Sequence, residues 1–410
     1  MSMIITSRVK TGLFRMCIIV NNAKRSLSKA AEPVKTSLYD FHVEHEGKMV
    51  DFAGFMLPVQ YGKDSIVNSH LHTRQKCSIF DVSHMLQTKI HGEDRIELIE
   101  RITTADIQGL PDNKGTLTVF TDKTTGGILD DLIVTKTTDG YLYVVSNAGR
   151  RDHDQNLMLE TEKQMIAENK KVKIEFLDLH EQSLIAVQGP DTQKILQPLC
   201  NIPLDKLYFM SSSLATVAGV EGCRITRCGY TGEDGVEISI PSKNIAEVTG
   251  TILKSQPEIV KLAGLGVRDS LRLEAGLCLY GSDIDTTVTP IEATLAWLVA
   301  KPRRERKDFP GWEVILKQLK EGTKTKRVGL KLDKGPPARH DCAIQSPSGE
   351  VIGKVTSGCP SPSVGGSVAM GYVNKDFSKN GTDVQVVIRG KSYPAKITKM
   401  PFVPSKYYTE

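Results

Sequence analysis

The sequence lacks any apolar run that approaches the roughly 18 residues needed to span a bilayer. We therefore expect no transmembrane segment and no membrane partner. The eight cysteines include no Cys-x-x-Cys pair and show no regular spacing, so we expect free thiols rather than a disulfide framework. A zinc pattern is missing too, because no second pair of ligands accompanies His70 and His72. We expect structural roles for these two histidines and no metal.

Acidic residues are missing from the first 31 positions. This stretch carries six basic residues and is rich in serine, and the first acid of the chain is Glu32. Such a composition is typical of a mitochondrial transit peptide, which we predict for residues 1–31. A disordered basic arm and a secretory signal are the alternatives, although the apolar run Cys17–Val20 is too short for the latter. Since the formal net charge of the whole chain is only +5, the remainder is close to neutral, and nothing indicates nucleic-acid binding.

The length of 410 residues is enough for two or three domains with a large core. Towards the C-terminus the chain changes to short apolar runs, separated by turn pairs such as Ser348-Gly349 and Asn380-Gly381. Short strands at this spacing predict a small barrel or sandwich.

The predicted organisation has four parts: a transit peptide over 1–31, a main region over 32–300, a linker over 301–311 and a C-terminal β-barrel domain over 312–410. The basic stretch Lys301–Lys307 has two interpretations. It is either a docking patch for an acidic partner or simply solvated linker, and the second is the simpler.

Two adjacent carboxylates, Asp130 and Asp131, lie inside an apolar hairpin. The runs Ile128–Val134 and Tyr141–Val145 flank Asp139-Gly140, a pair typical of a tight hairpin turn. Neighbouring residues of a strand point to opposite faces, so a carboxylate must lie against apolar surface. Its desolvation there has to be offset by a partner or a role.

The register of this hairpin decides what lies opposite Asp131. If Asp139-Gly140 is a two-residue turn, Asp131 falls opposite residues 146–148, and Asn147 comes within reach of the acid. The alternative is a pair of solvated aspartates at the edge of a sheet, and the pattern alone does not separate the two.

A glycine-rich loop, Gly229–Gly235, joins two further strand patterns. It is not a phosphate loop, because no Gly-Lys-Ser/Thr and no helix pattern follow it. In the second strand Glu237 lies on the face opposite Val236 and Ile238, and the pattern alone favours an exposed side chain. The helix predicted over Val267–Ala275 raises the same question for Arg268 and Arg272. They share one face, and ordinary surface ion pairs would explain them.

Six long blocks carry a resemblance to a known family: Ser69–Met85, Gly126–Asn147, Arg227–Ser239, Arg268–Gly281, Thr356–Ser363 and Lys399–Tyr408. In these blocks the chain resembles the aminomethyltransferase, or T-protein, family of the mitochondrial glycine cleavage system. The resemblance covers nearly everything from Leu38 onward. Phe55 departs from the family, which usually has tryptophan there, and we expect this to change packing rather than chemistry.

The resemblance implies an α+β fold, a multi-domain cloverleaf of antiparallel sheets with helices plus a C-terminal small β-barrel. It places two interleaved subdomains of a folate-binding region in residues 32–300. It implies a reaction in which the one-carbon unit of an aminomethyl group, carried on the dihydrolipoyl arm of H-protein, moves to tetrahydrofolate. The products are 5,10-methylenetetrahydrofolate and ammonia. The implied location is the mitochondrial matrix, and the implied chemistry needs no metal.

The resemblance also implies residue roles. Asp131 matches the catalytic acid that contacts the folate near N10, Glu237 and Arg268 match residues that hold the pterin, and Tyr407 matches a residue that reaches in from the C-terminus. Met85 and Asn147 match further positions that line the site.

A rival class shares this type of fold. The folate-linked iron–sulfur assembly factors are non-catalytic scaffolds that carry a Lys-Gly-Cys-Tyr-x-Gly-Gln-Glu segment. In this chain Arg227–Asp234 has the cysteine shifted and the glutamine absent, which favours the transferase over the scaffold.

Overall fold

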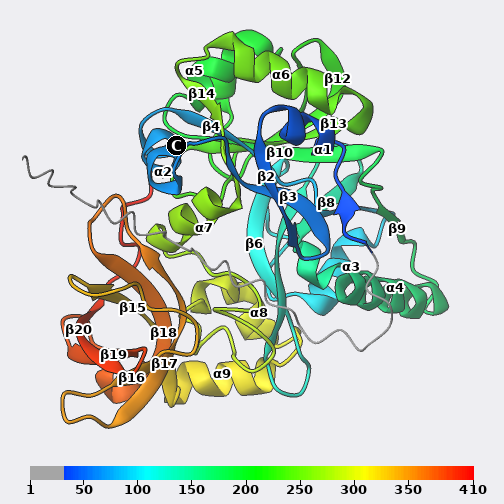
Figure 1. The fold of residues 1–410 in the computed structure, drawn as a ribbon. Coiled ribbons are helices and arrows are strands. Elements are labelled where there is room, and N and C mark those ends of the chain that lie inside the picture. Colours follow the sequence, from blue (N-terminus) through cyan, green and yellow to red (C-terminus); the bar gives the residue numbers. More distant parts are fainter. Residues whose placement is uncertain (1–31) are drawn as a thin grey trace, which may run out of the picture.

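The structure, a computed structural model, describes residues 32–410 and arranges them as three lobes around a common centre (Figure 1). The predicted transit peptide lies outside the described residues. Two lobes are built on open sheets covered by helices, and the third is a closed barrel. The α+β class and the C-terminal barrel are therefore confirmed. Within residues 32–410 no helix combines the length and the apolar composition that crossing a membrane requires.

The first lobe, at the top of Figure 1, is a six-stranded sheet in the order β11-β12-β13-β10-β4-β14. Its strands are β4 Cys77–Asp81, β10 Gln182–Gln188, β11 Ser212–Val217, β12 Val220–Thr226, β13 Gly235–Pro241 and β14 Val260–Leu262. The central strands β4 and β10 are buried on both faces, so they read as continuous apolar runs rather than alternating ones.

Helices α5 (Thr192–Leu196) and α6 (Ile245–Ser255) bury apolar side chains in the core of this lobe. The sequence predicts a helix over Ser242–Lys254 with a serine cap, and that cap is wrong. Ser242 Oγ instead donates to the carbonyl of Leu179 at 2.9 Å, and α6 begins three residues later, after a single 3-10 turn.

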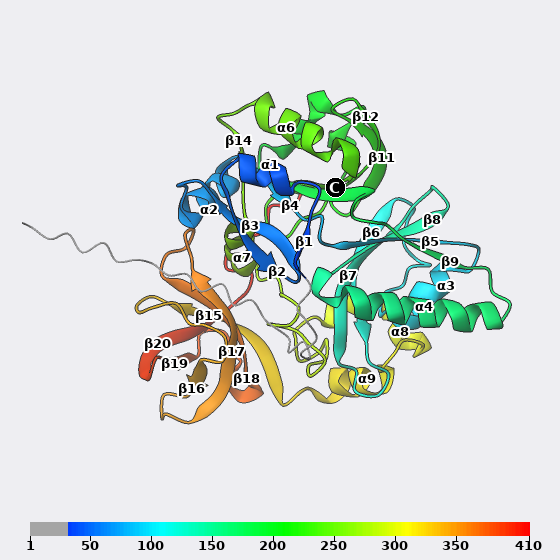
Figure 2. The ribbon, with the colours of Figure 1, turned by 45° about the vertical axis from the view of Figure 1, so that its right-hand side comes forward.

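The second lobe is a five-stranded sheet in the order β6-β7-β8-β5-β9. Its strands are β5 Leu86–His91, β6 Lys114–Thr121, β7 Ile128–Lys136, β8 Tyr141–Ser146 and β9 Lys173–Phe176. Helices α3 (Arg95–Ile102) and α4 (Arg151–Ala167) cover one face and pack apolar side chains against it (Figure 2).

The chain enters the second lobe between β4 and β5 and returns to the first through β10, so the two lobes are interleaved. The sequence predicts one strand over residues 77–90. The structure breaks it at residues 82–85, because β4 and β5 belong to different sheets.

A small sheet in the order β1-β3-β2 precedes both lobes. It consists of β1 Val34–Lys35, β2 Gly47–Phe52 and β3 Phe55–Tyr61, with α1 (Tyr39–Glu44) between the first two strands. Helix α2 (Ile66–Gln75) follows, and Ser65 Oγ caps it by accepting from Asn68 N at 3.1 Å.

Helix α7 (Leu265–Glu274) lies between the first lobe and the barrel (Figure 1). Val267 and Leu271 pack under β4 and β10, whereas Leu273 packs with Cys359 of the barrel. Gly276 follows the helix with a φ of +72°, the left-handed conformation that glycine adopts readily after a helix. One helix therefore touches two of the three lobes.

Helices α8 (Lys301–Arg306) and α9 (Trp312–Glu321) lead into the barrel. Arg303 is only 1% exposed, and its guanidinium donates to Asp308 Oδ1 at 2.6 Å and to the carbonyl of Glu100 at 2.5 Å. Residues 301–306 thus form a helix in which Arg303 turns inward, while Lys301, Glu305 and Arg306 stay exposed. The domain boundaries at residues 300 and 311 stay predictions.

The barrel closes in the order β15-β18-β17-β16-β19-β20. Its strands are β15 Thr325–Leu332, β16 Ala343–Gln345, β17 Val351–Pro360, β18 Ser367–Asn374, β19 Asp383–Ile388 and β20 Lys391–Thr398. After β20 the chain leaves the barrel, and Figures 1 and 2 show its C-terminus near β4 of the first lobe.

Candidate functional site

A cavity of about 1010 Å³ lies where the lobes meet. Its walls come from both sheets, helix α7, the barrel and the C-terminal tail. All six predicted site residues line it: Met85, Asp131, Asn147, Glu237, Arg268 and Tyr407. The fold thus brings together residues that are 322 positions apart in the sequence, Met85 and Tyr407. The role of each residue stays a prediction.

Asp131 reaches the cavity from β7, a strand in the interior of the second sheet. The pairing of Leu132 with Ser146 sets Asp131 opposite Asn147, and Asn147 Nδ2 donates to Asp131 Oδ1 at 2.9 Å. The predicted contact between the two is confirmed. The alternative of solvated aspartates at a sheet edge is wrong, because β7 lies between β6 and β8.

The turn of this hairpin differs from the prediction. The last paired residues are Lys136 and Leu142, so Asp139 stands at the centre of the connection, and Asp139-Gly140 is not a two-residue turn. Gly140 has a φ of +84°, which favours glycine. A shift of one residue in the register would have turned Asp131 away from the cavity.

The environment of Asp131 favours its neutral form. Burial, followed by the negative charge of Asp130, raises the pKa of Asp131 to about 7, while the hydrogen bond from Asn147 acts in the opposite direction. Near neutral pH this carboxyl can therefore either carry a negative charge or exchange a proton.

Glu237 and Arg268 face the cavity from β13 and α7. Burial raises the pKa of Glu237, against the opposing effects of the Arg268 charge and of a hydrogen bond from the Cys228 thiol. The exposed Glu237 that the pattern favours is therefore wrong. The face of β13 that carries Glu237 is covered by the second lobe and the barrel. It therefore forms a wall of the cavity and not an exposed surface.

Arg268 has donors without acceptors. Its Nη1 is buried and has no hydrogen-bond partner within residues 32–410. Its guanidinium carbon lies 4.8 Å from the centre of the Tyr230 ring, which holds the group over the cavity. An unpaired buried donor costs free energy unless a ligand supplies the acceptor.

Tyr407 enters the cavity on the C-terminal tail. Its ring stacks on Phe209 with centroids 4.2 Å apart and planes at 11°. Backbone hydrogen bonds fix the tail on both sides, from Lys406 N to the carbonyl of Gly232 at 2.8 Å and from Phe209 N to the carbonyl of Tyr408 at 2.7 Å.

His84, Cys228 and Tyr230 line the cavity and were not singled out from the sequence. Burial lowers the pKa of His84 to about 4, so its imidazole is neutral near neutral pH. Its Nδ1 has no partner in the described part of the chain. The sequence did hold a signal for His84, because this residue lies in the segment that interrupts the predicted strand. Binding and catalytic residues are often found in such connecting segments.

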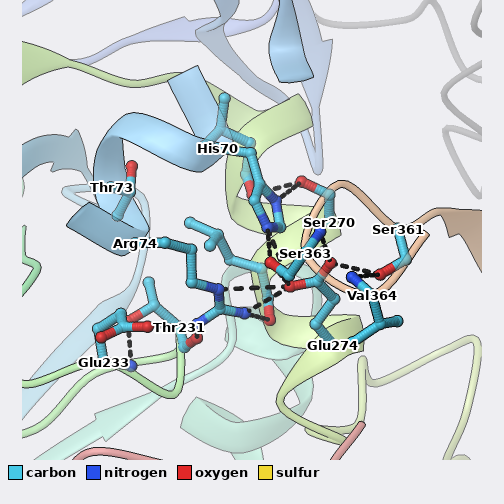
Figure 3. Close-up of polar contacts among 12 residues, drawn as sticks. His70, Thr73, Arg74, Thr231, Glu233, Ser270, Glu274, Ser361, Ser363 and Val364 are labelled. Atoms are coloured by element: carbon cyan, nitrogen blue, oxygen red, sulfur yellow. Dashed lines mark hydrogen bonds and ion pairs between the residues drawn. The ribbon is translucent and has the colours of Figure 1, made fainter. Parts of the chain in front are cut away.

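Beside the cavity, the second half of α7 carries a separate polar cluster (Figure 3). Glu274 is fully buried and accepts from His70 Nε2 at 2.9 Å and Arg74 Nη2 at 3.0 Å. It also accepts from Ser361 Oγ at 2.5 Å and Ser363 Oγ at 2.6 Å in the barrel. The expected structural role of His70 is confirmed.

Arg272 belongs to this satisfied part of α7. It is 2% exposed and donates to Asp283 Oδ2 at 2.5 Å and Asp269 Oδ1 at 2.8 Å. The expected ion pair with Asp269 is confirmed for Arg272, although Arg272 itself is buried and not on the surface. Arg272 is buried and paired, whereas Arg268 forms no ion pair with an acid of residues 32–410 and faces the cavity.

The cavity opens among lysines of the barrel lobe. Lys326, Lys375, Lys379 and Lys399 line it and are exposed. None of these four side chains forms an ion pair with a carboxylate of residues 32–410. This exposed part of the cavity lining therefore carries positive charge.

The seven cysteines that lie within residues 32–410 are all free thiols, as expected. The same part of the chain contains no group of three or more His, Cys, Asp or Glu side chains arranged to hold a metal ion.

Known proteins of one family match this chain along most of its length. The family model described as the GCVT N-terminal domain matches residues 38–303, and the glycine cleavage T-protein C-terminal barrel domain matches residues 326–404. The chain is similar to the mitochondrial aminomethyltransferases of Homo sapiens, at 54% identity over 94% of each chain, and of Flaveria anomala, at 47% identity over 94% of this chain and 93% of the relative. It also resembles the crystal structure of glycine cleavage system aminomethyltransferase T from Bartonella henselae, with a TM-score of 0.84, 34% identity and coverage of 92% of this chain and 100% of that one.

Proposed function

Because the chain belongs to the glycine cleavage T-protein family and is therefore an aminomethyltransferase, we propose that it moves the one-carbon unit of an aminomethyl group from the dihydrolipoyl arm of H-protein to tetrahydrofolate. The products are 5,10-methylenetetrahydrofolate, ammonia and dihydrolipoyl H-protein. The names of its relatives support a mitochondrial location, and we propose the matrix as the compartment. The observation that carries the proposal is the convergence of Asp131, Glu237 and Arg268 on one cavity.

The donors and acceptors of the cavity suit a pterin. The edge of a pterin presents a ring N–H and an amino group side by side, which one carboxylate can accept together, and Glu237 offers that carboxylate. Arg268 supplies a buried donor that nothing in residues 32–410 satisfies, and a neighbouring acceptor of the pterin would satisfy it. Burial makes both interactions stronger than they would be in water.

Asp131 is the residue that we propose for catalysis. Positive character develops on the transferred carbon and on the folate nitrogens during the transfer. The ionised carboxyl of Asp131 would orient N10 and stabilise that charge in a site shielded from water. Since its pKa is raised to about 7, the same group can also accept a proton near neutral pH.

The remaining predicted residues support this geometry. Asn147 fixes the Asp131 carboxyl by its hydrogen bond, and Met85 and Tyr407 provide apolar walls. The four unpaired lysines at the opening match the carboxylates of the glutamate end of the folate, which would remain near solvent.

The test supplies the purified protein with aminomethylated H-protein and tetrahydrofolate, and follows ammonia and methylenetetrahydrofolate. We expect both products in equal amounts, and neither when the folate or the aminomethyl group is left out. Folate binding without either product would overturn the proposed reaction and would instead fit a folate-binding scaffold.

A further inference from the structure

The connection between β4 and β5 carries His84, a cavity residue that the mechanism proposed above does not use. His84 lines the cavity, and only 3% of it is exposed. The turn around it is closed by a hydrogen bond from Met85 N to the carbonyl of Val82 at 3.1 Å. Arg151 Nη2 lies 3.4 Å from the carbonyl oxygen of His84 and holds the backbone from the other lobe. The fold therefore places His84 at the cavity wall without help from a ligand.

Aromatic side chains hold the imidazole ring of His84. Its centre lies 5.6 Å from that of Phe52, with the two planes at 84°, and 6.2 Å from that of Phe55. The guanidinium carbon of Arg151 lies 5.9 Å from the centre of the Phe55 ring and packs on this group from outside. These contacts restrict rotation of the imidazole, so its two nitrogens keep fixed places.

The two ring nitrogens differ in their surroundings. Nδ1 of His84 is buried and has no hydrogen-bond partner within residues 32–410. Nε2 has no partner there either, but it is not enclosed, and the open space that His84 lines is the cavity. Because burial lowers the pKa of His84 to about 4, the ring is neutral near neutral pH and carries one proton on one of these nitrogens.

The enclosed nitrogen indicates where that proton lies. Arg151 Nε, close to His84, is already a buried donor without an acceptor in the described part of the chain. A proton on Nδ1 would add a second one, and a buried N–H group is costly to leave unpaired. We therefore expect the lone pair on Nδ1 and the proton on Nε2, which makes the nitrogen at the cavity a hydrogen-bond donor.

Arg268 supplies a second donor in the same part of the cavity. Its neighbour Val267 belongs to the same apolar cluster as Val82 and Met85, which flank His84. Arg268 Nη1 has no acceptor within residues 32–410, and the charge of Arg268 acts on the imidazole. One oxygen with two lone pairs, such as a carbonyl, can accept from two neighbouring donors.

Under the proposed function this carbonyl belongs to the pterin, which carries one at C4. We propose that His84 is a specificity-determining residue, which donates from Nε2 to the pterin carbonyl beside Arg268 and so selects a pterin with oxygen at C4 over one with an amino group there. An amino group would set donor against donor. His84 does not adapt to it readily, because moving the proton to Nδ1 would enclose an N–H group. The identity of the ligand rests on the proposed function, whereas the tautomer of His84 does not.

The test compares the binding of tetrahydrofolate and of its 4-amino counterpart, tetrahydroaminopterin, to the full chain by fluorescence titration. The wild type should prefer tetrahydrofolate by about 100-fold or more. His84→Phe keeps an aromatic ring but removes the donor, so tetrahydrofolate binding should weaken by about 5- to 10-fold and the preference should shrink by a similar factor. Urea unfolding should show no loss of stability. An unchanged preference in this variant would overturn the proposal.

Two amide variants form a matched pair. The side-chain amide of His84→Gln can reach the place of imidazole Nε2, whereas the shorter amide of His84→Asn replaces Nδ1. We expect His84→Gln to bind tetrahydrofolate nearly as well as the wild type and His84→Asn to behave like His84→Phe. Recovery of binding in His84→Asn but not in His84→Gln would overturn the assignment of the donor.

A further measurement needs no ligand. NMR of the protein with 15N-labelled histidine should show the His84 signal, identified by its absence from His84→Gln, as the neutral Nε2–H tautomer at neutral pH. A proton on Nδ1 would reject the proposal. If the transfer assay fails while the preference for tetrahydrofolate and this tautomer are found, the proposed reaction is at fault and the role of His84 stands. Binding of neither pterin to the wild type would overturn both.

Discussion

Helix α7 carries two charged clusters that differ in whether their polar groups have partners. Around Glu274 the acid is surrounded by donors from α2 and the barrel. Although burial opposes ionisation, the hydrogen bonds led by His70 lower the pKa of Glu274 to about 2. Around Arg268 the opposite holds, because Arg268 Nη1 and His84 Nδ1 are buried and find no hydrogen-bond partner among residues 32–410, and Asp131 on the facing wall has a pKa raised to about 7.

The difference shows how structural and functional polar groups can be told apart within one interface. The Glu274 carboxylate has its hydrogen-bond partners without a ligand. The free energy of these interactions therefore helps to hold the first lobe and the barrel together. The groups of the cavity are left unsatisfied by the fold, and they become satisfied only when something binds. The four predictions below test this contrast in order of decreasing effect.

Glu274→Gln should give the largest effect. It would leave Arg74 and His70 buried without their shared carboxylate, and breaking such a pair costs about 3–5 kcal/mol. The free energy of unfolding in urea measures this. Glu175→Gln is the matched control, since Glu175 Oε2 lies 2.9 Å from His91 Nε2 in an exposed pair, where the loss should stay below about 1 kcal/mol. Equal losses in the two variants would contradict the contrast.

Asp131→Asn should lower kcat by about 100- to 1000-fold, because the charge that stabilises the transition state is removed. Its fold and its affinity for tetrahydrofolate should remain close to wild type, since Asn147 can still donate to the new amide oxygen. Steady-state production of ammonia measures kcat. Turnover at the wild-type rate would remove Asp131 from the catalytic role.

Arg268→Met should weaken tetrahydrofolate binding by about 10- to 100-fold, as expected for a charged hydrogen bond of about 1.5–3 kcal/mol. Because its Nη1 has no partner in residues 32–410, stability should change little. Arg272→Met, one turn further along α7, should instead lower the free energy of unfolding, since it leaves Asp283 buried and unpaired. Fluorescence titration measures tetrahydrofolate binding and urea unfolding measures stability in both variants. A loss of stability in Arg268→Met together with a loss of binding in Arg272→Met would contradict the contrast between the two arginines.

The smallest effect concerns the pH dependence of stability. Since the folded-state pKa of Asp131 is raised to about 7, its favourable contribution is complete at low pH and is lost as the pH rises through 7. Asp131→Asn should therefore be more stable than the wild type at about pH 8 and equal to it below about pH 4. For Glu274 the pH dependence of stability has the opposite sign. Its contribution to the free energy of unfolding is complete above its unfolded pKa and is lost as the pH falls towards 2. Unfolding measured at both pH values separates the two, and a lower stability of Asp131→Asn at pH 8 would contradict the assignment.

The predicted elements were mostly recovered, and the failures share one cause. The barrel, the helix over Val267–Ala275 and the hairpin around Asp131 are confirmed, because period and turn residues are local properties of the chain. The strand predicted over residues 77–90 was wrong, and the local pattern did not show that Arg303 is buried, since sheet membership and the burial of Arg303 depend on distant segments. The predicted site residues do share one cavity, but it was the family resemblance, and not the local pattern, that selected them.

By itself, the sequence determined the family and the C-terminal barrel, because these depend on long motifs and on local turn residues, and it offered the contact of Asp131 with Asn147 as one of two alternatives. Only the tertiary structure decided that Arg272 is satisfied and Arg268 is not, and that Glu237 faces a cavity. The physical reason is that the partners come from far along the chain. His70 and Glu274 are 204 positions apart. The residues next to either one in sequence do not show whether such a distant partner lies within hydrogen-bond distance in the folded chain.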